Sequence, residues 1–142
     1  MEGSAGVGID IHGWVEVRPR FHPPVLPDLE LRRWDGIVKL DHLLARNTAL
    51  CAALFAVGTA PPESALAARR GLPDDLSQEA EAAYLTDAED PAAVAWPSWV
   101  TLEELQAATW ESLGCDWTVL FALMGTLAAE YSGVRLVVWF DY

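Results

Sequence analysis

The stretch Ile9-Asp10-Ile11-His12-Gly13-Trp14-Val15-Glu16-Val17-Arg18 alternates between apolar and polar residues. Successive side chains of a β-strand point to opposite faces, so this alternation predicts a half-buried strand. The apolar side chains would face the core, and they are Ile9, Ile11, Val15 and Val17. The opposite face would carry the polar side chains and one indole, from Asp10, His12, Trp14, Glu16 and Arg18.

The last residues of the chain form a second strand pattern, Val134-Arg135-Leu136-Val137-Val138-Trp139-Phe140-Asp141-Tyr142. β-Branched and aromatic residues dominate it, and Val134, Leu136, Val138 and Phe140 share one face. The first and last strands have the strongest apolar patterns in the chain, and central strands need two good partners. We therefore expect these two strands to be neighbours.

Four helices are expected, each beginning at a side chain that can accept a hydrogen bond from a free N–H of the first turn. They cover Asp41 to about Phe55, a short acidic segment after Ser77, Leu102 to about Trp110, and Asp116 to Gly133. Thr101 and Glu104 fit a capping box before the third helix.

The remaining segments are expected to be one strand and several loops. Trp34 to Leu40 is predicted as a strand, whereas four prolines between residues 19 and 27 predict an extended loop. Residues 69–75 and 86–97 are also predicted as loops. The fold class is α+β, with one domain of residues 1–142. Its small antiparallel sheet would have helices packed on one face, those from Asp41 and Asp116, and two shorter helices at the edge.

The formal net charge of −12 is concentrated in one part of the chain. Residues 71–134 contain twelve acidic and no basic side chains. Such a surface repels phosphate backbones, so direct nucleic-acid binding is not expected. The acidic stretch is either a solvated face that keeps the protein soluble or a flank that attracts a basic partner.

The sequence shows no targeting signal and no arrangement of cysteines that suggests disulfides. No secretory signal or membrane segment is recognisable, and Cys51 and Cys115 suggest no disulfide framework, so we expect a cytoplasmic protein. The sequence sets no oligomeric state. His12, His22 and His42 are scattered, and no nucleotide-binding loop is present, so no metal and no cofactor are expected.

Pairing of the first and last strands would gather one candidate site from Asp10, His12, Trp14, Glu16, Arg135, Trp139 and Asp141. His12 is the candidate general base, and Asp10 or Asp141 would hold its imidazole in one tautomer. Arg135 would hold an anionic group. Trp14 and Trp139 would supply flat apolar walls for a ligand or partner. The alternative is an ordinary solvent-exposed sheet face, since such faces are normally polar, but two tryptophans on the polar side favour a functional surface.

A second candidate is the loop that contains Arg69, Arg70 and Asp74. Its guanidinium groups could clamp a phosphate or a carboxylate. The alternative is that salt bridges to the domain itself pin the loop in place.

Short blocks along nearly the whole chain carry a family resemblance. They are Gly8-Ile9-Asp10-Ile11-His12, Arg46-Asn47, Leu54-Phe55, Arg70-Gly71-Leu72-Pro73 with Asp75 and Ser77, Ser98-Trp99, and Trp139-Phe140-Asp141. These blocks resemble those of a group of uncharacterised bacterial and phage-borne small proteins that open with Gly-Cys-Asp-Ile-His. The resemblance implies candidate site positions and no particular reaction.

Two departures from that group concern the site. This chain has Ile9 where the group has cysteine, and Ala95-Trp96-Pro97 where the group commonly has a His-Ser pair before its Ser-Trp block. If the group's site uses two histidines, this chain has lost that chemistry or uses Trp96 for a different ligand.

Two functions follow from these residues. The first is a binding module that engages a protein partner or a small ligand through its Trp-rich polar sheet face and its acidic flank. The second is a small enzyme that uses His12 as the base. An enzyme should have a concave pocket around His12, whereas a module should expose a flat Trp-rich patch.

Overall fold

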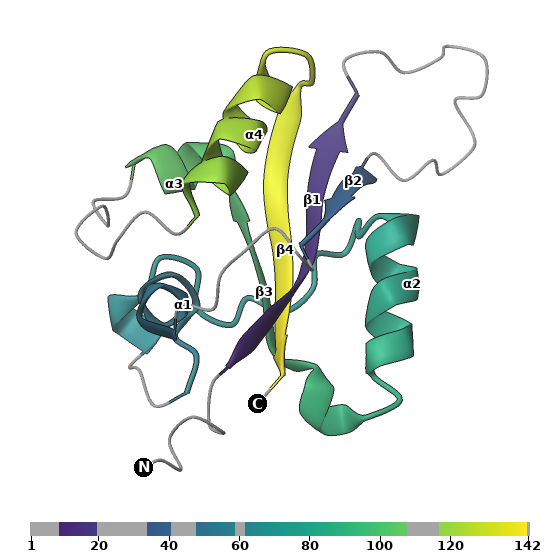
Figure 1. Cartoon of the computed structure of the whole chain (residues 1–142), viewed down its shortest axis with the longest axis vertical. Coiled ribbons are helices and arrows are strands. Elements are labelled where there is room, and N and C mark those ends of the chain that lie inside the picture. Colours follow the sequence, from purple (N-terminus) through teal and green to yellow (C-terminus); the bar gives the residue numbers. More distant parts are fainter. Residues whose placement is uncertain (1–8, 20–33, 41–47, 59–61, 108–116, 142) are drawn as a thin grey trace.

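A four-stranded antiparallel sheet forms the centre of the computed structural model, which describes residues 9–19, 34–40, 48–58, 62–107 and 117–141. The strands lie in the order β2-β1-β4-β3 (Figure 1). Their bounds are β1 Asp10–Arg18, β2 Asp35–Lys39, β3 Ala95–Thr101 and β4 Gly133–Asp141. The first and last strands are therefore central neighbours, as the sequence predicted.

The β1–β4 register is unbroken from Asp10 opposite Asp141 to Arg18 opposite Gly133. Residues directly opposite each other in an antiparallel pair share a sheet face. One face therefore carries three successive pairs, which are His12 with Trp139, Trp14 with Val137, and Glu16 with Arg135.

Helices cover both faces of the sheet (Figure 1). Their bounds are α1 Thr48–Phe55, α2 Gln78–Asp87, α3 Leu102–Ala107 and α4 Thr118–Ala128, with short 3₁₀ turns at Pro62–Ser64 and Pro91–Ala93. The α+β class and the antiparallel sheet are confirmed. Helices α1, α3 and α4 lie on one side, and α2, which was expected at the edge, lies against the opposite side.

The main core lies between the sheet and α1, α3 and α4. Its sheet side is built from the alternating apolar residues of β1 and β4, including Val15, Val17, Leu136, Val138 and Phe140. Leu120 and Met124 of α4 are fully buried against them. The two strand patterns therefore identified the core-facing side chains correctly.

Two of the four expected helix starts are confirmed. The Ser77 hydroxyl accepts a hydrogen bond from the Ala80 N–H at 3.2 Å. Thr101 and Glu104 form the capping box, since the Glu104 N–H donates to Thr101 Oγ1 at 3.2 Å and the Thr101 N–H to Glu104 Oε1 at 3.1 Å. The other two expected caps, Asp41 and Asp116, lie outside the described residues, as does the segment after Ala107.

Strand β3 was predicted as a loop over its first residues, and that prediction is wrong. Pro97 lacks the N–H that a ladder needs, but β3 is an edge strand, where proline is tolerated. The register shifts between Ala95 and Ser98, and Trp96 takes a positive φ of 50° at this irregularity. The Gly71 N–H donates to the Pro97 carbonyl at 2.9 Å, so the loop before α2 lies along this edge.

Gly13 is required where β1 passes β4. Its φ is +145°, and a Cβ at this position would collide with the carbonyl oxygen of Val137. We expect Gly13→Ala to lower the free energy of unfolding by about 1–3 kcal/mol, measured by urea denaturation. Gly125 is the matched control, because a Cβ there meets nothing within 4 Å. Gly125→Ala in α4 should leave stability unchanged or raise it by up to about 1 kcal/mol; equal losses at both sites would contradict this account.

Candidate functional site

The sheet face that carries His12, Trp139 and Arg135 was expected to be polar and open, but much of it is covered. Leu76 and Ala80 pack with Val137 and Trp139 in a second hydrophobic cluster under α2. Gly36 of β2 lets the helix approach closely, since a Cβ there would lie 2.7 Å from the Glu79 Cβ. The face is thereby divided into a buried ion-pair network, a covered aromatic cluster and a partly open end.

Glu16 and Arg135 form the centre of the buried network. Their exposed fractions are 0% and 4%, and Arg135 Nε lies 2.6 Å from Glu16 Oε1. The second Glu16 oxygen accepts the Ser77 N–H at 2.8 Å. Arg135 also donates to Asp75 Oδ1 at 2.9 Å. The network therefore holds the segment from Asp75 to Ser77 onto the sheet, rather than presenting free ligand-binding groups.

Asp75 and Trp34 complete this network. Trp34 Nε1 donates to Asp75 Oδ2 at 3.0 Å, and the Arg135 guanidinium lies 4.0 Å from the centroid of the Trp34 ring. Desolvation of Asp75 opposes ionisation, but its hydrogen bond and ion pair with Arg135 outweigh it and lower the pKa of that carboxyl. Asp75 is therefore a charged partner of Arg135.

Trp139 is buried, at 1% exposure, which differs from the expected solvent-facing indole. Its ring meets Tyr84 of α2 edge-on at 5.2 Å, and its Nε1 donates to Asp87 Oδ2 at 2.8 Å. Trp14 is half-buried on the same face, and its indole N–H has no hydrogen-bond partner in the described part of the chain. Neither ring therefore forms an open flat wall.

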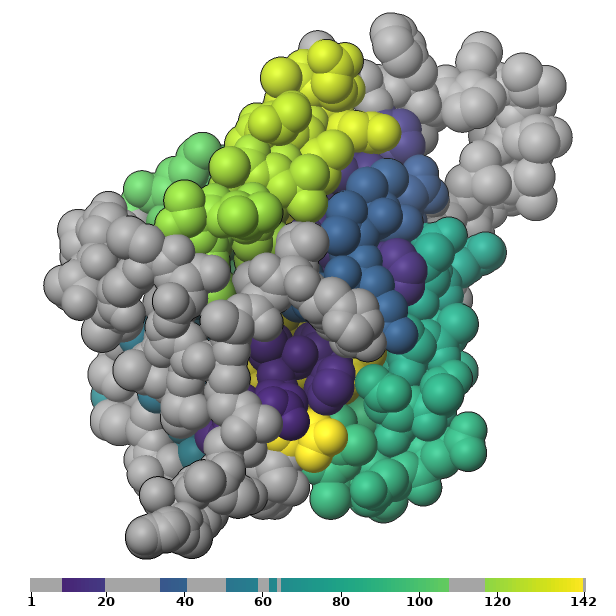
Figure 2. Space-filling view, viewed as in Figure 1, coloured from purple at the N-terminus to yellow at the C-terminus, as the bar shows by residue number. Residues whose placement is uncertain are grey.

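His12 lies at the partly open end of this face. Its Nε2 is 3.8 Å from Asp141 Oδ2, and the two side chains are 27% and 46% exposed. Asp10 pairs directly opposite Asp141. In Figure 2 the beginning of β1 and the end of β4 lie at the surface beside α2. The structure thus brings His12 and Asp141 together, at a separation longer than a hydrogen bond.

Trp96 lies on the other side of the sheet from His12. Its ring packs against Phe140 of the main core at 6.5 Å, and the Arg69 guanidinium lies 5.8 Å from it. Arg69 donates to the carbonyl of Ala56 at 2.9 and 3.1 Å. The structure therefore places Trp96 beside Arg69 and away from the candidate residues around His12.

A pocket of about 560 Å³ lies on the α2 side of the sheet, and its lining residues are Arg70, Leu72, Pro73, Asp74, Asp75, Trp99 and Arg135. It joins the two segments that were predicted separately to hold an anion, the Arg70 loop and the Arg135 strand. His12 is not among the lining residues. The pocket is built by the loop before α2, which Glu16 and Arg135 fix in place.

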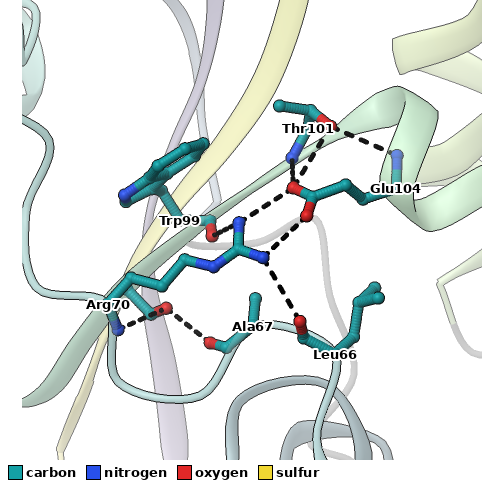
Figure 3. Close-up of polar contacts among 7 residues, drawn as sticks. Leu66, Ala67, Arg70, Trp99, Thr101 and Glu104 are labelled. Atoms are coloured by element: carbon teal, nitrogen blue, oxygen red, sulfur yellow. Dashed lines mark hydrogen bonds and ion pairs between the residues drawn. The ribbon is translucent and has the colours of Figure 1, made fainter.

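Arg70 is held by the domain itself (Figure 3). Its terminal nitrogens donate to both Glu104 oxygens at 2.8 and 2.6 Å and to the carbonyls of Trp99 and Leu66 at 3.2 and 3.3 Å. Its guanidinium lies 4.9 Å from the centroid of the Trp99 ring. These contacts fit the alternative that salt bridges pin this loop in place.

The Arg70–Glu104 pair shifts both groups toward their charged forms. The hydrogen bond to Glu104 raises the pKa of Arg70, in spite of partial burial. The same bond lowers the pKa of Glu104 from 4.5 to about 2, and the backbone N–H of Thr101 adds to the effect. The pair therefore stays ionised well into acid.

This shift predicts how stability depends on pH. The pKa of Glu104 is lowered on folding, so its contribution is fully present above 4.5 and is lost as the pH falls toward about 2. We expect Glu104→Gln to be less stable than the parent at neutral pH, with the difference shrinking in this acid range. Urea midpoints at neutral pH and at about pH 3 test this. A difference that is independent of pH would contradict it.

Sequence reasoning did not identify Trp99 and Asp75 as site residues. Their one signal is that both belong to blocks of the resemblance described above. Within residues 9–19, 34–40, 48–58, 62–107 and 117–141, no group of three or more metal-ligating side chains could hold a metal ion. None of the helices in these ranges is long and apolar enough to cross a membrane.

Comparisons with known proteins add no relatives. No protein-family model matches the chain, and no curated protein or solved structure matches it significantly.

Proposed function

We propose that this protein is a small binding module that takes a ligand or a segment of a protein partner in the pocket beside Trp99. The observation that carries the proposal is the pocket itself, about 560 Å³ in volume, where Arg70, Asp74 and Trp99 converge. Ligand pockets have volumes of about 300–1,000 Å³ and combine apolar walls with a few polar groups. Leu72, Pro73 and Trp99 supply such walls here.

The lining residues favour binding over catalysis. The described residues that line the pocket include no histidine, cysteine, serine or lysine, and their only ionisable acids are Asp74 and Asp75. Arg70 and Arg135 are both ion-paired, and Asp75 accepts hydrogen bonds from Arg135 and Trp34. The walls are thus fixed in position before a ligand arrives, which lowers the entropic cost of binding.

We also propose a cytoplasmic location for the module. Cys51 is a free, buried thiol, and burial raises its pKa to about 12. Such a thiol is an inert core residue, and reduced cysteines are usual in the cytoplasm.

Ligand-observed NMR with a library of anionic, neutral and cationic fragments tests the proposed site. We expect Trp99→Ala to weaken the hits by about 5-fold or more, and Asp74→Asn to weaken cationic hits by a similar factor while strengthening anionic ones. Asp74 is exposed, so Asp74→Asn should fold normally even if Trp99→Ala does not. The control is Leu85→Ala, at a side chain that is 62% exposed and does not line the pocket. Binding that is unchanged in both pocket variants would refute the proposed site.

A second candidate function is a small enzyme with His12 as its base. The observation that favours it is the partly exposed His12–Asp141 pair at 3.8 Å. In that case His12→Ala should abolish binding or turnover of a substrate with little change in stability. Hits that are bound equally by the parent and His12→Ala, but not by Asp74→Asn, would favour the binding module.

A further inference from the structure

The charge around the pocket is negative in spite of its two guanidinium groups. Arg70 is paired with Glu104, and Arg135 with Glu16 and Asp75. Asp74 lines the same pocket, so two guanidinium groups stand against four carboxylates. Each guanidinium is therefore neutralised by at least one carboxylate within 2.6–2.9 Å. The surplus favours a cationic ligand over an anionic one.

Most guanidinium N–H groups of Arg70 and Arg135 already donate hydrogen bonds within the protein, so few remain for an anion. Each terminal nitrogen of Arg70 has two N–H groups, and the two nitrogens together donate to Trp99 O, Leu66 O and both Glu104 oxygens. Arg135 is 4% exposed and donates to Glu16 and Asp75. A phosphate or carboxylate would have to break these charge-assisted bonds. The contacts therefore argue against the anion clamp that the sequence suggested for Arg70 and Arg135.

The remaining pocket walls suit a cation. Tryptophan is the best aromatic acceptor for cation–π contacts. The Arg70 guanidinium, whose charge Glu104 balances, lies 4.9 Å from the centroid of the Trp99 ring, and a ligand cation would share this ring with it. Asp74 lines the same pocket and is exposed. A carboxylate beside an indole attracts a guanidinium or an ammonium group by charge and by the ring face together.

Acidic residues near the pocket favour a ligand that carries several positive charges. Residues 71–134 contain no basic side chain. Exposed acids are Asp74 and Asp75 of the loop, Glu79 of α2, and Glu89 and Asp90 just after α2. A ligand with several positive charges would meet matching charge along this surface. The same surface repels nucleic acid.

From this we infer that the pocket binds an arginine or lysine side chain presented by a basic segment of a partner protein. The inference rests on the proposed binding function and names the partner's chemistry. The charged head group would lie between Trp99 and Asp74, with the flanking basic residues of the segment facing the acidic surface of α2.

Fluorescence anisotropy with three labelled peptides of equal length tests the inference. One peptide carries arginine, the second carries citrulline at the same positions, and the third carries glutamate. Citrulline keeps the planar shape of arginine without its charge. We expect the arginine peptide to bind at least about 10-fold more tightly than the citrulline peptide, with binding that weakens as salt is raised, and the glutamate peptide not to bind.

Two charge-matched variants separate this pocket from the general acidity of the chain. Asp74→Asn should weaken the arginine peptide by about 5-fold or more. Glu130→Gln removes one exposed carboxylate that does not line the pocket, and should leave affinity nearly unchanged. Equal losses in both variants would overturn the inference, because binding would then follow net charge alone.

Comparison with the fragment screen separates failure of the basic-segment inference from failure of the proposed binding function. If neutral or anionic fragments occupy the pocket while the arginine and citrulline peptides bind equally or not at all, the basic-segment inference is wrong and the binding module stands. If N-acetyl-arginine amide binds as tightly as the peptide, the ligand is a small cation and the basic-segment inference fails. If no probe of any charge binds, the proposed function is wrong as well.

Discussion

Glu16→Gln is expected to lower the free energy of unfolding by about 3 kcal/mol or more, although it changes only one functional group. Glu16 is fully buried, and its two oxygens accept the Arg135 Nε–H and the Ser77 N–H. Removing its charge leaves the buried guanidinium with Asp75 alone. Breaking one partner of a buried ion pair costs far more than losing an exposed pair. Urea denaturation of both proteins at neutral pH measures the difference.

A double replacement is the control for this ion pair. Glu16→Leu/Arg135→Met removes both charges and keeps apolar volume, so it should be less destabilised than the sum of the two single variants. Free energies that simply add would show that Glu16 and Arg135 do not act as a buried pair. In that case the segment from Asp75 to Ser77 would have to be held in some other way.

Leu120→Ala is the second large effect, with an expected loss of about 2–5 kcal/mol. Leu120 is fully buried on α4, in the core between that helix and the sheet. Truncation removes buried methyl groups and leaves a cavity that the close-packed surroundings fill only partly. Urea or thermal unfolding measures the loss.

Val119 is the matched control, since it is the preceding residue of the same helix and 68% exposed. Val119→Ala should change stability by no more than about 0.5 kcal/mol. A loss at Leu120 below this level would contradict the assignment of the core, whatever the result at Val119.

The first strand could be predicted from its apolar–polar alternation, and the last strand from its β-branched and aromatic residues. Every residue of Val134–Phe140 is buried in the structure, however, including Arg135 and Trp139, which were assigned to the polar face. Polar and aromatic residues at alternate positions look the same in sequence whether they face water or a covering helix. In the structure α2 covers this face of the sheet, and its position does not follow from the strand sequences.

The position of α2 could not be predicted for a related reason. A covering helix is normally recognised by a stripe of large apolar residues. In α2 the largest aliphatic side chain, Leu85, is exposed, whereas Ala80 is buried. Small residues allow the close approach, since Gly36 and Ala80 let the helix lie near the sheet, and Tyr84 is the large α2 side chain that packs on Trp139. Small-residue contacts of this kind leave little trace in hydrophobic periodicity.

The candidate site was predicted in parts. Arg70 and Arg135 were identified as guanidinium groups of interest, and the structure places both on one pocket. Their bonding to Glu104, Glu16 and Asp75 depends on residues 34 to 119 positions away, which local spacing cannot reveal. The charge preference of the pocket, and with it the proposed ligand class, follows from these distant partners.

Chemical-shift mapping on ¹⁵N-labelled protein locates the binding site residue by residue. Titration with the tightest-binding probe should move the backbone signals of Leu72 and Asp74 and the indole N–H of Trp99 most strongly, since these residues line the pocket. The signals of His12 and Asp141 should move little. The largest shifts at His12 and Asp141, with Leu72, Asp74 and Trp99 unmoved, would contradict the account and favour the partly open end of the sheet as the functional site.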